Sequence, residues 1–139
     1  MIAGVGIDVV DVPGFRRQVE DVASCFVAGT FTPLELAEVA SRPAADKTPH
    51  LAARYAAKEA FVKAWSAAAR GHPQALLSVD LRQIEVVSDV RGRPSLHLRA
   101  QVKEAFSRLG VLRSHLSLSH DGPVATAMVV LERDASNPA

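Results

Sequence analysis

The chain has 139 residues, of which 48% are hydrophobic and 22% are charged, and these values are typical of one soluble globular domain. Its formal net charge of +1 gives no electrostatic reason to expect a nucleic acid or a membrane as its partner. The chain shows neither an apolar run of membrane-spanning length nor a basic segment before a long apolar stretch, so we expect a cytoplasmic protein.

Residues 2–10 form a short, nearly continuous apolar run, which is typical of a buried central strand. Gly4 and Gly6 within this run predict that another backbone approaches closely. Asp8 conflicts with its surroundings, because an ionised carboxylate in a buried strand must be paired or bound to a metal. The alternative, that Asp8 only caps or bonds the following turn, stays open at this point.

The next segment contains a helix start. Asp11 predicts an N-cap, and Pro13 fits the first turn of a helix that exposes Arg16 and Arg17. By pattern alone, these two arginines belong to a solvated face. Cys25 is the only cysteine and cannot form an internal disulfide, and its apolar neighbours predict a small buried side chain.

A second helix start precedes the longest predicted helix. Thr32 and Glu35 form a capping box around Pro33, and residues 41–49 read as a loop with two prolines. The long helix is expected from about His50 to near Gly71, with Pro73 just beyond its end.

The long helix contains the main candidate functional residues. One side carries only small residues and should pack closely against another element: Ala53, Ala56, Ala57, Ala60 and Ala64. A second face carries Arg54, Lys58, Phe61 and Trp65. Glu59 and Lys63 lie one turn apart between these faces, and taken alone they can be an ordinary ion pair on a solvated helix.

Strand patterns dominate the rest of the chain, in residues 84–88, 96–99, 115–120 and 124–131. Residues 89–94 connect the first two strands as a hairpin turn, and Asp121-Gly122 connects the last two. Residues 101–109 form an amphipathic helix that Gly110 ends. These elements predict an α+β fold, with an antiparallel sheet and a long central helix, over residues 1–132. A flexible tail follows at 133–139.

Five of these residues together suggest one type of chemistry. A strand carboxylate and a helix carboxylate, Asp8 and Glu59, can share a hard cation such as Mg²⁺. Lys58 and Lys63 near such an ion make sense if the substrate carries phosphate. Together with His120, they indicate metal-assisted phosphoryl chemistry, either by a transferase or by a phosphohydrolase.

Five motifs in this order resemble the holo-acyl-carrier-protein synthase family, the small 4′-phosphopantetheinyl transferases, and the details look most like actinobacterial members. The motifs are Gly4-Val-Gly-Ile-Asp8-Val-Val, Phe31-Thr32 with Glu35, Arg54-Tyr-Ala-Ala-Lys58-Glu59-Ala-Phe-Val-Lys63-Ala64, Gly92-Arg93-Pro94 and His115-Leu-Ser-Leu-Ser-His120. The resemblance implies magnesium-dependent transfer of 4′-phosphopantetheine from coenzyme A to a serine of an acyl carrier protein, or of a carrier domain of a fatty acid synthase. Adenosine 3′,5′-bisphosphate would be released, and the family is usually a homotrimer with active sites between subunits.

The resemblance also implies roles for individual residues. Asp8 and Glu59 match the magnesium ligands, and Lys63 would neutralise the pyrophosphate as it splits. The adenosine bisphosphate end would lie at Arg54 and Gly92-Arg93-Pro94, with Lys58 as a further phosphate contact. Arg16 and Arg17 match the helix that docks the acidic carrier protein.

The proton acceptor stays open between Glu59, a magnesium-bound water and the His120-Asp121 pair. His120 falls on the same strand face as Leu116 and Leu118, so we expect it to turn inward, with Asp121 orienting it. The alternative is that the pair only shapes the hairpin turn.

One departure from the family pattern lies after Lys63. Many members continue with a compact Gly-x-Gly, whereas residues 64–71 intervene here, so the phosphate contacts of this segment are not predicted. Two other functions stay open: a non-catalytic module that binds coenzyme A or a carrier protein, and a magnesium-dependent phosphohydrolase.

Overall fold

The computed structural model describes residues 1–72 and 78–136, and these residues form five strands, five α-helices and one short 3₁₀ helix. In chain order the elements are β1 (Ile2–Asp11), α1 (Val12–Glu20), α2 (Phe26–Thr30), α3 (Pro33–Ala40), α4 (Thr48–Ala68), η1 (Leu81–Gln83), β2 (Ile84–Ser88), β3 (Pro94–Leu98), α5 (Ala100–Arg108), β4 (Val111–Asp121) and β5 (Val124–Arg133). Within this described part, no helix has the length and apolarity to cross a membrane. Pro73 and the end of the predicted tail, 137–139, lie outside the described residues.

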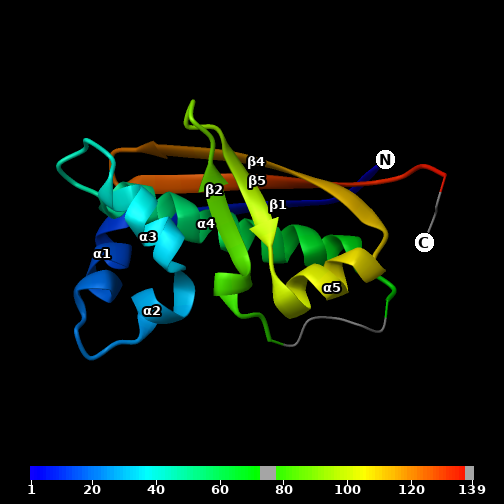
Figure 1. Ribbon diagram of the computed structural model, residues 1–139, viewed down its shortest axis with the longest axis horizontal. Coiled ribbons are helices and arrows are strands. Elements are labelled where there is room, and N and C mark those ends of the chain that lie inside the picture. Colours follow the sequence, from blue (N-terminus) through cyan, green and yellow to red (C-terminus); the bar gives the residue numbers. More distant parts are fainter. Residues whose placement is uncertain (73–77, 137–139) are drawn as a thin grey trace.

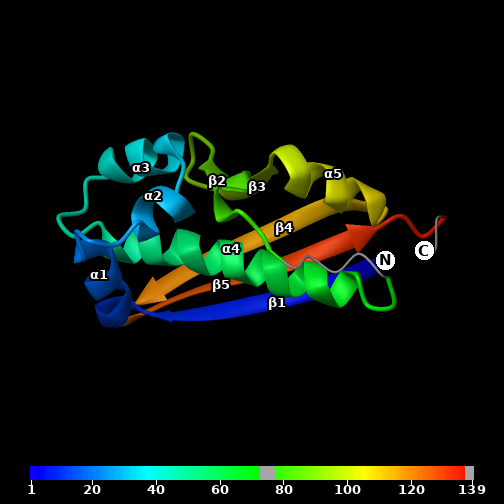
Figure 2. The same cartoon turned by 90° about the horizontal axis from the view of Figure 1, so that it is seen from below.

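Three of the strands form an antiparallel sheet in the order β1-β5-β4, and β2 and β3 form a separate antiparallel hairpin. The long helix α4 lies between these two parts: β1 runs along one side of it, and the hairpin lies with α3 and α5 on the other (Figures 1 and 2). The predicted α+β fold, with an antiparallel sheet and a long central helix, is confirmed.

The close approach predicted from Gly4 and Gly6 occurs between β1 and α4. A Cβ atom built on Gly6 would lie 1.9 Å from the carbonyl oxygen of Ala60, and one on Gly4 would lie 2.1 Å from that of Ala64. On the helix side, the five alanines of the predicted small face are at most 3% exposed. Backbone therefore meets backbone here, since neither element has a side chain large enough to separate them.

Local signals in the sequence placed most element ends correctly. The Asp11 carboxylate accepts a hydrogen bond from the Gly14 N–H at 2.9 Å, and the Thr32–Glu35 capping box forms in both directions. Gly122 has a φ of +53° in the β4–β5 turn. The helix α4 runs to Ala68, three residues before the predicted end near Gly71, and Gly71 has a φ of +85° in the turn that follows.

Two predictions about burial are wrong. The strand β1 lies at the edge of the sheet and is covered on one face only, so Val5, Ile7 and Val9 are 50–64% exposed on the other. Cys25 is exposed, because it lies at the start of the short helix α2, where its neighbour Phe26 packs on the core and it does not.

Candidate functional site

Asp8, Glu59 and Lys63 come together where β1 crosses α4. The Lys63 ammonium donates to Asp8 Oδ1 at 2.9 Å and to the Ile7 carbonyl oxygen at 3.0 Å. The Asp8 side chain is 16% exposed and the Lys63 side chain 54%, so the lysine reaches the carboxylate from the solvent side. The pairing of a strand carboxylate with the helix residues, expected from the sequence, is therefore present in the fold.

A groove of about 460 Å³ opens beside these residues, and we call it the carboxylate groove. Its lining includes Asp8, Asp11, Gly14, Gln18, Tyr55 and Glu59. Burial raises the pKa of Glu59, and the negative charge of Asp8 raises this pKa further. The pKa of Tyr55 is also raised, by burial and by the charges of Glu59 and Asp8. The groove thus concentrates negative charge that Lys63 only partly offsets.

This excess of negative charge fits a divalent cation. Among the described residues, no group of three or more His, Cys, Asp and Glu side chains is arranged to hold a metal, so the candidates are the two carboxylates of Asp8 and Glu59. Mg²⁺ commonly takes one or two protein carboxylates and completes its octahedron with water and substrate phosphate oxygens.

A second cavity, of about 190 Å³, lies on another face of α4, and we call it the basic pocket. It is lined by Arg42, His50, Ala53, Arg54, Ser88, Gly92, Pro94, Leu118 and His120. The rings of His50 and His120 meet edge to face, with centroids 5.3 Å apart. Burial lowers the pKa of His50, and the positive charges of His120, Arg42 and Arg54 lower it further. Such a pocket can bind an anion.

Arg54 is held rigidly at the wall of the basic pocket. Its side chain is 3% exposed and donates to Glu38 Oε1 at 2.9 Å and to the His50 carbonyl oxygen at 3.1 Å. Its buried Nε has no hydrogen-bond partner among the described residues. A buried guanidinium with spare donor capacity is consistent with an oxygen-rich ligand.

The basic pocket contains two residues that sequence reasoning missed, Arg42 and His50. His50 lies four residues before Arg54 on the same side of α4, and this spacing was visible in the sequence. Arg42 follows α3 in a loop, and its place depends on how α3 and the β2–β3 hairpin pack together. The sequence carries no local signal for that.

The structure separates the two groups of predicted site residues within one chain. Asp8 lies on β1 and His120 on β4, and these strands form opposite edges of the sheet. Along α4, Glu59 follows Arg54 by five residues, which rotates it by about 140° around the helix. The carboxylate groove and the basic pocket share no lining residue.

His120 and Asp121 do not act as a pair in this chain. His120 shares the basic pocket with Leu118, as expected from strand alternation, although the residue as a whole is exposed. The next strand position projects to the opposite face, and among the described residues no hydrogen bond or ion pair joins Asp121 to His120. The prediction that Asp121 orients His120 therefore does not fit the geometry.

Lys58 does not lie at either site. Its side chain is fully buried, and its ammonium donates to Glu35 Oε1 at 2.7 Å, to the Leu81 carbonyl oxygen at 2.8 Å and to that of Ile84 at 2.9 Å. All three donors of the ammonium are used. The phosphate contact expected for Lys58 is therefore replaced by a structural bond between α3, α4 and β2.

The other predicted residues lie at the margins of these sites. Gly92 and Pro94 line the basic pocket, whereas Arg93 is 73% exposed and pairs with Asp89 at 2.6 Å. On α1, Arg17 is exposed, but Arg16 binds Asp46 Oδ2 at 2.7 Å. The hydrogen bond from Arg16 lowers the pKa of Asp46.

Comparison with known proteins adds a consistent result. A family model described as the 4′-phosphopantetheinyl transferase superfamily matches residues 4–127. The holo-[acyl-carrier-protein] synthase of Mycobacterium ulcerans is 42% identical over 132 residues, covering 94% of this chain and 97% of that protein. A coenzyme A complex of the ACPS from Chronobacterium ammoniagenes is 40% identical with a TM-score of 0.84, covering 94% and 97%. The acyl carrier protein synthase of Mycobacterium tuberculosis is 40% identical with a TM-score of 0.75, covering 96% and 100%.

Proposed function

Because the chain belongs to the 4′-phosphopantetheinyl transferase superfamily, we propose that it transfers 4′-phosphopantetheine from coenzyme A to a serine of an acyl carrier protein, with Mg²⁺ as its cofactor. The chain is an enzyme of the holo-[acyl-carrier-protein] synthase type. The observation that carries the proposal is the meeting of Asp8, Glu59 and Lys63 at the edge of one groove. These residues belong to the motifs that resemble those of the synthases, and they supply the charges that a pyrophosphate substrate requires.

The reaction follows from the bonds of coenzyme A. The serine Oγ bonds to the phosphorus that carries the pantetheine arm, and the bond from this phosphorus to the bridging oxygen of the pyrophosphate breaks. The serine proton passes to a base, and adenosine 3′,5′-bisphosphate leaves with the bridging oxygen. Negative charge grows on that oxygen, so a cationic group beside it stabilises the transition state.

The residues of the carboxylate groove fit this charge distribution. Asp8 and Glu59 would hold Mg²⁺, which when bound screens the pyrophosphate charge. Lys63 is exposed enough to exchange its contact with Asp8 for one with a phosphate oxygen. Binding of a cation also relieves the repulsion that raises the pKa of Glu59.

We place the adenosine bisphosphate end in the basic pocket. Arg42 and Arg54 supply positive charge there, the rings of His50 and His120 supply further nitrogen atoms for hydrogen bonds, and Pro94 offers an apolar surface for a base. The two cavities share no lining residue, and their strand residues come from β1 and β4, at opposite edges of the sheet. This separation supports a site in which the groove of one copy lies beside the basic pocket of another.

The uncovered sheet face supports such an assembly. Gly4 and Gly6 face α4, so the alternating residues Val5, Ile7 and Val9 face outward, beside Met128 and Val124 of β5. These five side chains are 40–64% exposed in the single chain, and a contiguous apolar face of this kind indicates a protein interface. We propose a homotrimer in which these faces meet, so that His120 serves a site of the neighbouring copy.

The carrier protein would approach from the side of α1. Gly14 and Gln18 of this helix line the carboxylate groove, and Arg17 is exposed next to them. An acidic carrier surface would therefore bring its serine to the groove from α1. Arg16 is already bound to Asp46, so we assign it to the stability of this helix. The cytoplasmic location stays a prediction.

Mass spectrometry tests the proposal directly. Apo acyl carrier protein is incubated with coenzyme A, Mg²⁺ and the enzyme, and a second sample contains a chelator in place of Mg²⁺. We expect the carrier to gain one phosphopantetheine with release of adenosine 3′,5′-bisphosphate, and only in the sample with Mg²⁺. Release of the bisphosphate without modification of the carrier would indicate a hydrolase, and binding without turnover would indicate a binding module.

A further inference from the structure

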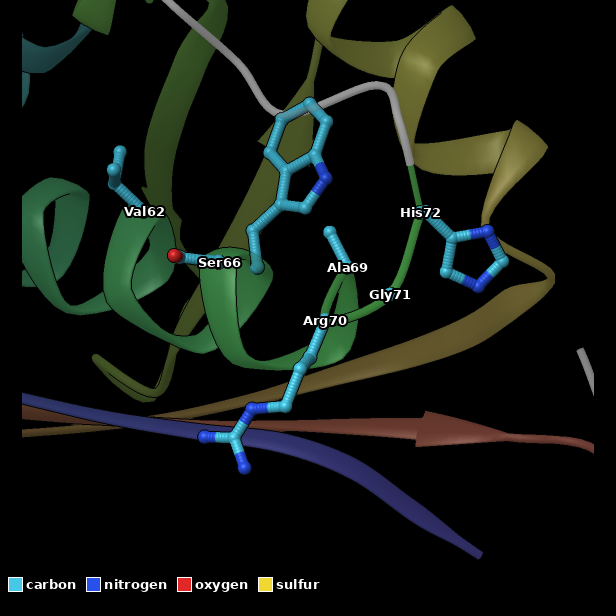
Figure 3. Close-up of a pocket in the computed structure, with 7 residues that line it drawn as sticks. Val62, Ser66, Ala69, Arg70, Gly71 and His72 are labelled. Atoms are coloured by element: carbon cyan, nitrogen blue, oxygen red, sulfur yellow. The ribbon is translucent and has the colours of Figure 1, made fainter.

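The basic pocket differs from another cavity with cationic side chains in how these side chains are held. At the C-terminal end of α4, a cavity of about 360 Å³ is lined in part by Arg70 and His72, but their side chains extend in different directions (Figure 3). In the basic pocket, Arg42 and Arg54 both contact the carboxylate of Glu38. A binding site needs polar groups in fixed places, so the role of Glu38 follows from these contacts.

Glu38 lies on α3, next to the basic pocket, and its carboxylate makes three contacts. Its Oε1 accepts a hydrogen bond from Arg54 Nη2 at 2.9 Å and lies 3.6 Å from Arg42 Nη2. Its Oε2 accepts from the Ser88 N–H at 3.3 Å. Arg42, Arg54 and Ser88 all line the pocket, whereas Glu38 does not. One carboxylate thus connects three parts of the pocket wall, which come from α4, the loop after α3 and the end of β2.

The contacts of Glu38 fix the directions of the two guanidinium groups. A guanidinium is planar, so hydrogen bonds at two of its nitrogen atoms fix its plane. In Arg54 these bonds run from Nη2 to Glu38 and from Nη1 to the His50 carbonyl oxygen. Arg42 Nη2 contacts Glu38 and also donates to Ser88 Oγ at 3.4 Å. Without Glu38, each guanidinium would keep only one of these contacts, and its plane could rotate.

Glu38 also changes the charge of the basic pocket. Burial acts to raise the pKa of Glu38, but hydrogen bonds from Ser88 and Arg54 outweigh burial and lower this pKa below the ordinary carboxyl value. Glu38 is therefore ionised at neutral pH and offsets one of the two arginine charges. A pocket that bound any anion by charge alone would be stronger without this carboxylate. Orientation of the arginines explains its presence, because orientation matters only for a ligand of defined shape.

We infer that Glu38 is a positioning residue of the enzyme, which holds Arg54 and Arg42 in the directions in which they contact the phosphates of coenzyme A. This inference rests on the proposed function, which places the adenosine bisphosphate end in the basic pocket. Glu38 lines neither this pocket nor the carboxylate groove, so it acts through the arginines and not on the reacting phosphorus. Its loss should weaken binding of the nucleotide and leave the chemical step unchanged.

Steady-state kinetics of Glu38→Gln test this role. The amide has the same shape but only one acceptor oxygen, so it cannot reproduce contacts made through two. We expect the KM for coenzyme A and the Kd of adenosine 3′,5′-bisphosphate, measured by calorimetry, to rise about tenfold or more. The kcat should stay within about twofold. Glu104→Gln, the same change on the exposed surface of α5, is the control and should alter neither constant. A variant that was only less stable would show a lower kcat at an unchanged KM.

Two further variants separate position from charge. Glu38→Asp keeps the negative charge and draws the carboxylate back by about 1.5 Å, the length of one carbon–carbon bond. We expect its KM for coenzyme A to rise by about threefold or more, because the shorter side chain cannot keep all its hydrogen bonds within range. Combining Glu38→Gln with Arg54→Lys should raise the KM by less than the product of the two single effects, because Glu38 acts through Arg54.

The outcomes separate this inference from the proposed function. Transfer by the wild type with an unchanged KM in both Glu38 variants would overturn the positioning role and leave the transferase intact. Tighter binding of the bisphosphate by Glu38→Gln would also overturn it, because charge would then outweigh orientation. A wild-type protein that binds the bisphosphate without transfer would overturn the proposed function alone, and the effect of Glu38→Gln on this binding would still decide the role of Glu38. Absence of both binding and transfer in the wild type would overturn both.

Discussion

The buried ion pair between Lys58 and Glu35 leads to a prediction about stability. In Lys58→Met the apolar stem is kept and the ammonium is lost. Glu35 is 0% exposed, so its carboxylate would stay buried without its counter-charge, and the carbonyl oxygens of Leu81 and Ile84 would lose their donor. Breaking a buried pair from one side costs about 3–5 kcal/mol, a large part of the roughly 5–15 kcal/mol that stabilises a domain.

The matched control is Lys63→Met, the same substitution one helical turn and a half further along α4. Lys63 is 54% exposed, and its pair with Asp8 is solvated, so its loss should change the free energy of unfolding by less than about 1 kcal/mol. Urea denaturation followed by Trp65 fluorescence compares the two, and we expect the midpoint of Lys58→Met to fall by roughly 2 M relative to Lys63→Met. Adding Glu35→Gln to Lys58→Met should restore part of the lost free energy of unfolding, because the double variant no longer has an unpaired buried carboxylate.

The same two variants should differ in activity in the opposite sense: the less stable variant should be the more active one. Lys63→Met should lose phosphopantetheine transfer while it stays folded, and Lys58→Met, at a temperature where it is folded, should keep most of its turnover. Equal unfolding midpoints for the two variants would refute the structural role of Lys58. Loss of turnover in fully folded Lys58→Met would show that Lys58 acts in catalysis after all.

Three further predictions follow from the same geometry. Glu59→Gln should abolish transfer, and wild-type turnover in this variant would contradict the metal assignment. Because the pKa of Glu59 is raised in the folded state, the stability of the wild type falls as pH rises above the ordinary carboxyl range. The variant should therefore be more stable than wild type at neutral pH without Mg²⁺. Gly6→Ala should lower the free energy of unfolding, measured by thermal denaturation, by about 1–3 kcal/mol or more, because the new Cβ would lie 1.9 Å from the Ala60 oxygen. The control Gly29→Ala, whose Cβ would have no atom within 4 Å, should be neutral or stabilising. Equal effects of the two substitutions would refute the contact. The variants His120→Ala and Glu59→Gln should each be inactive alone. If each site uses two copies, co-assembly of the two variants should restore about a quarter of the sites. No recovery of activity in a mixed trimer, identified by light scattering, would place both residues in the site of one chain.

Most of the secondary structure could be predicted from the sequence because its signals are local. The Asp11 cap, the Thr32–Glu35 capping box and the Gly122 turn are each decided by residues within one turn, and each forms as expected. The carboxylate site was also predictable in outline. Asp8 is unusual in an apolar strand, whereas Glu59 stood out only through the combination of motifs, and the glycines of β1 indicate that the strand crosses another backbone closely.

The errors concern properties that depend on packing between distant segments. Lys58 lies in the same helical turn as Glu59, but α3 and η1 cover it, and nothing near Lys58 in the sequence indicates this cover. The apolar run in β1 looked buried on both faces, yet Val5, Ile7 and Val9 are exposed on the outer face, and an exposed apolar face has the same composition as a core. His120 was grouped with Glu59 by chemistry alone, and only the sheet order shows that the strands of Asp8 and His120 form opposite edges of the sheet.

The direct contact of β1 with α4 also affects how freely the interior can change during evolution. In most enzymes a strand and a helix are held apart by side chains, and a substitution in that layer shifts the residues above it. Here the carbonyl groups of Ala60 and Ala64 meet the strand at Gly6 and Gly4, so main-chain atoms fix the spacing between the backbones that carry Asp8 and Lys63. Substitutions among apolar residues on the far side of α4, such as Val86 or Phe106, can therefore accumulate without moving these two backbones apart.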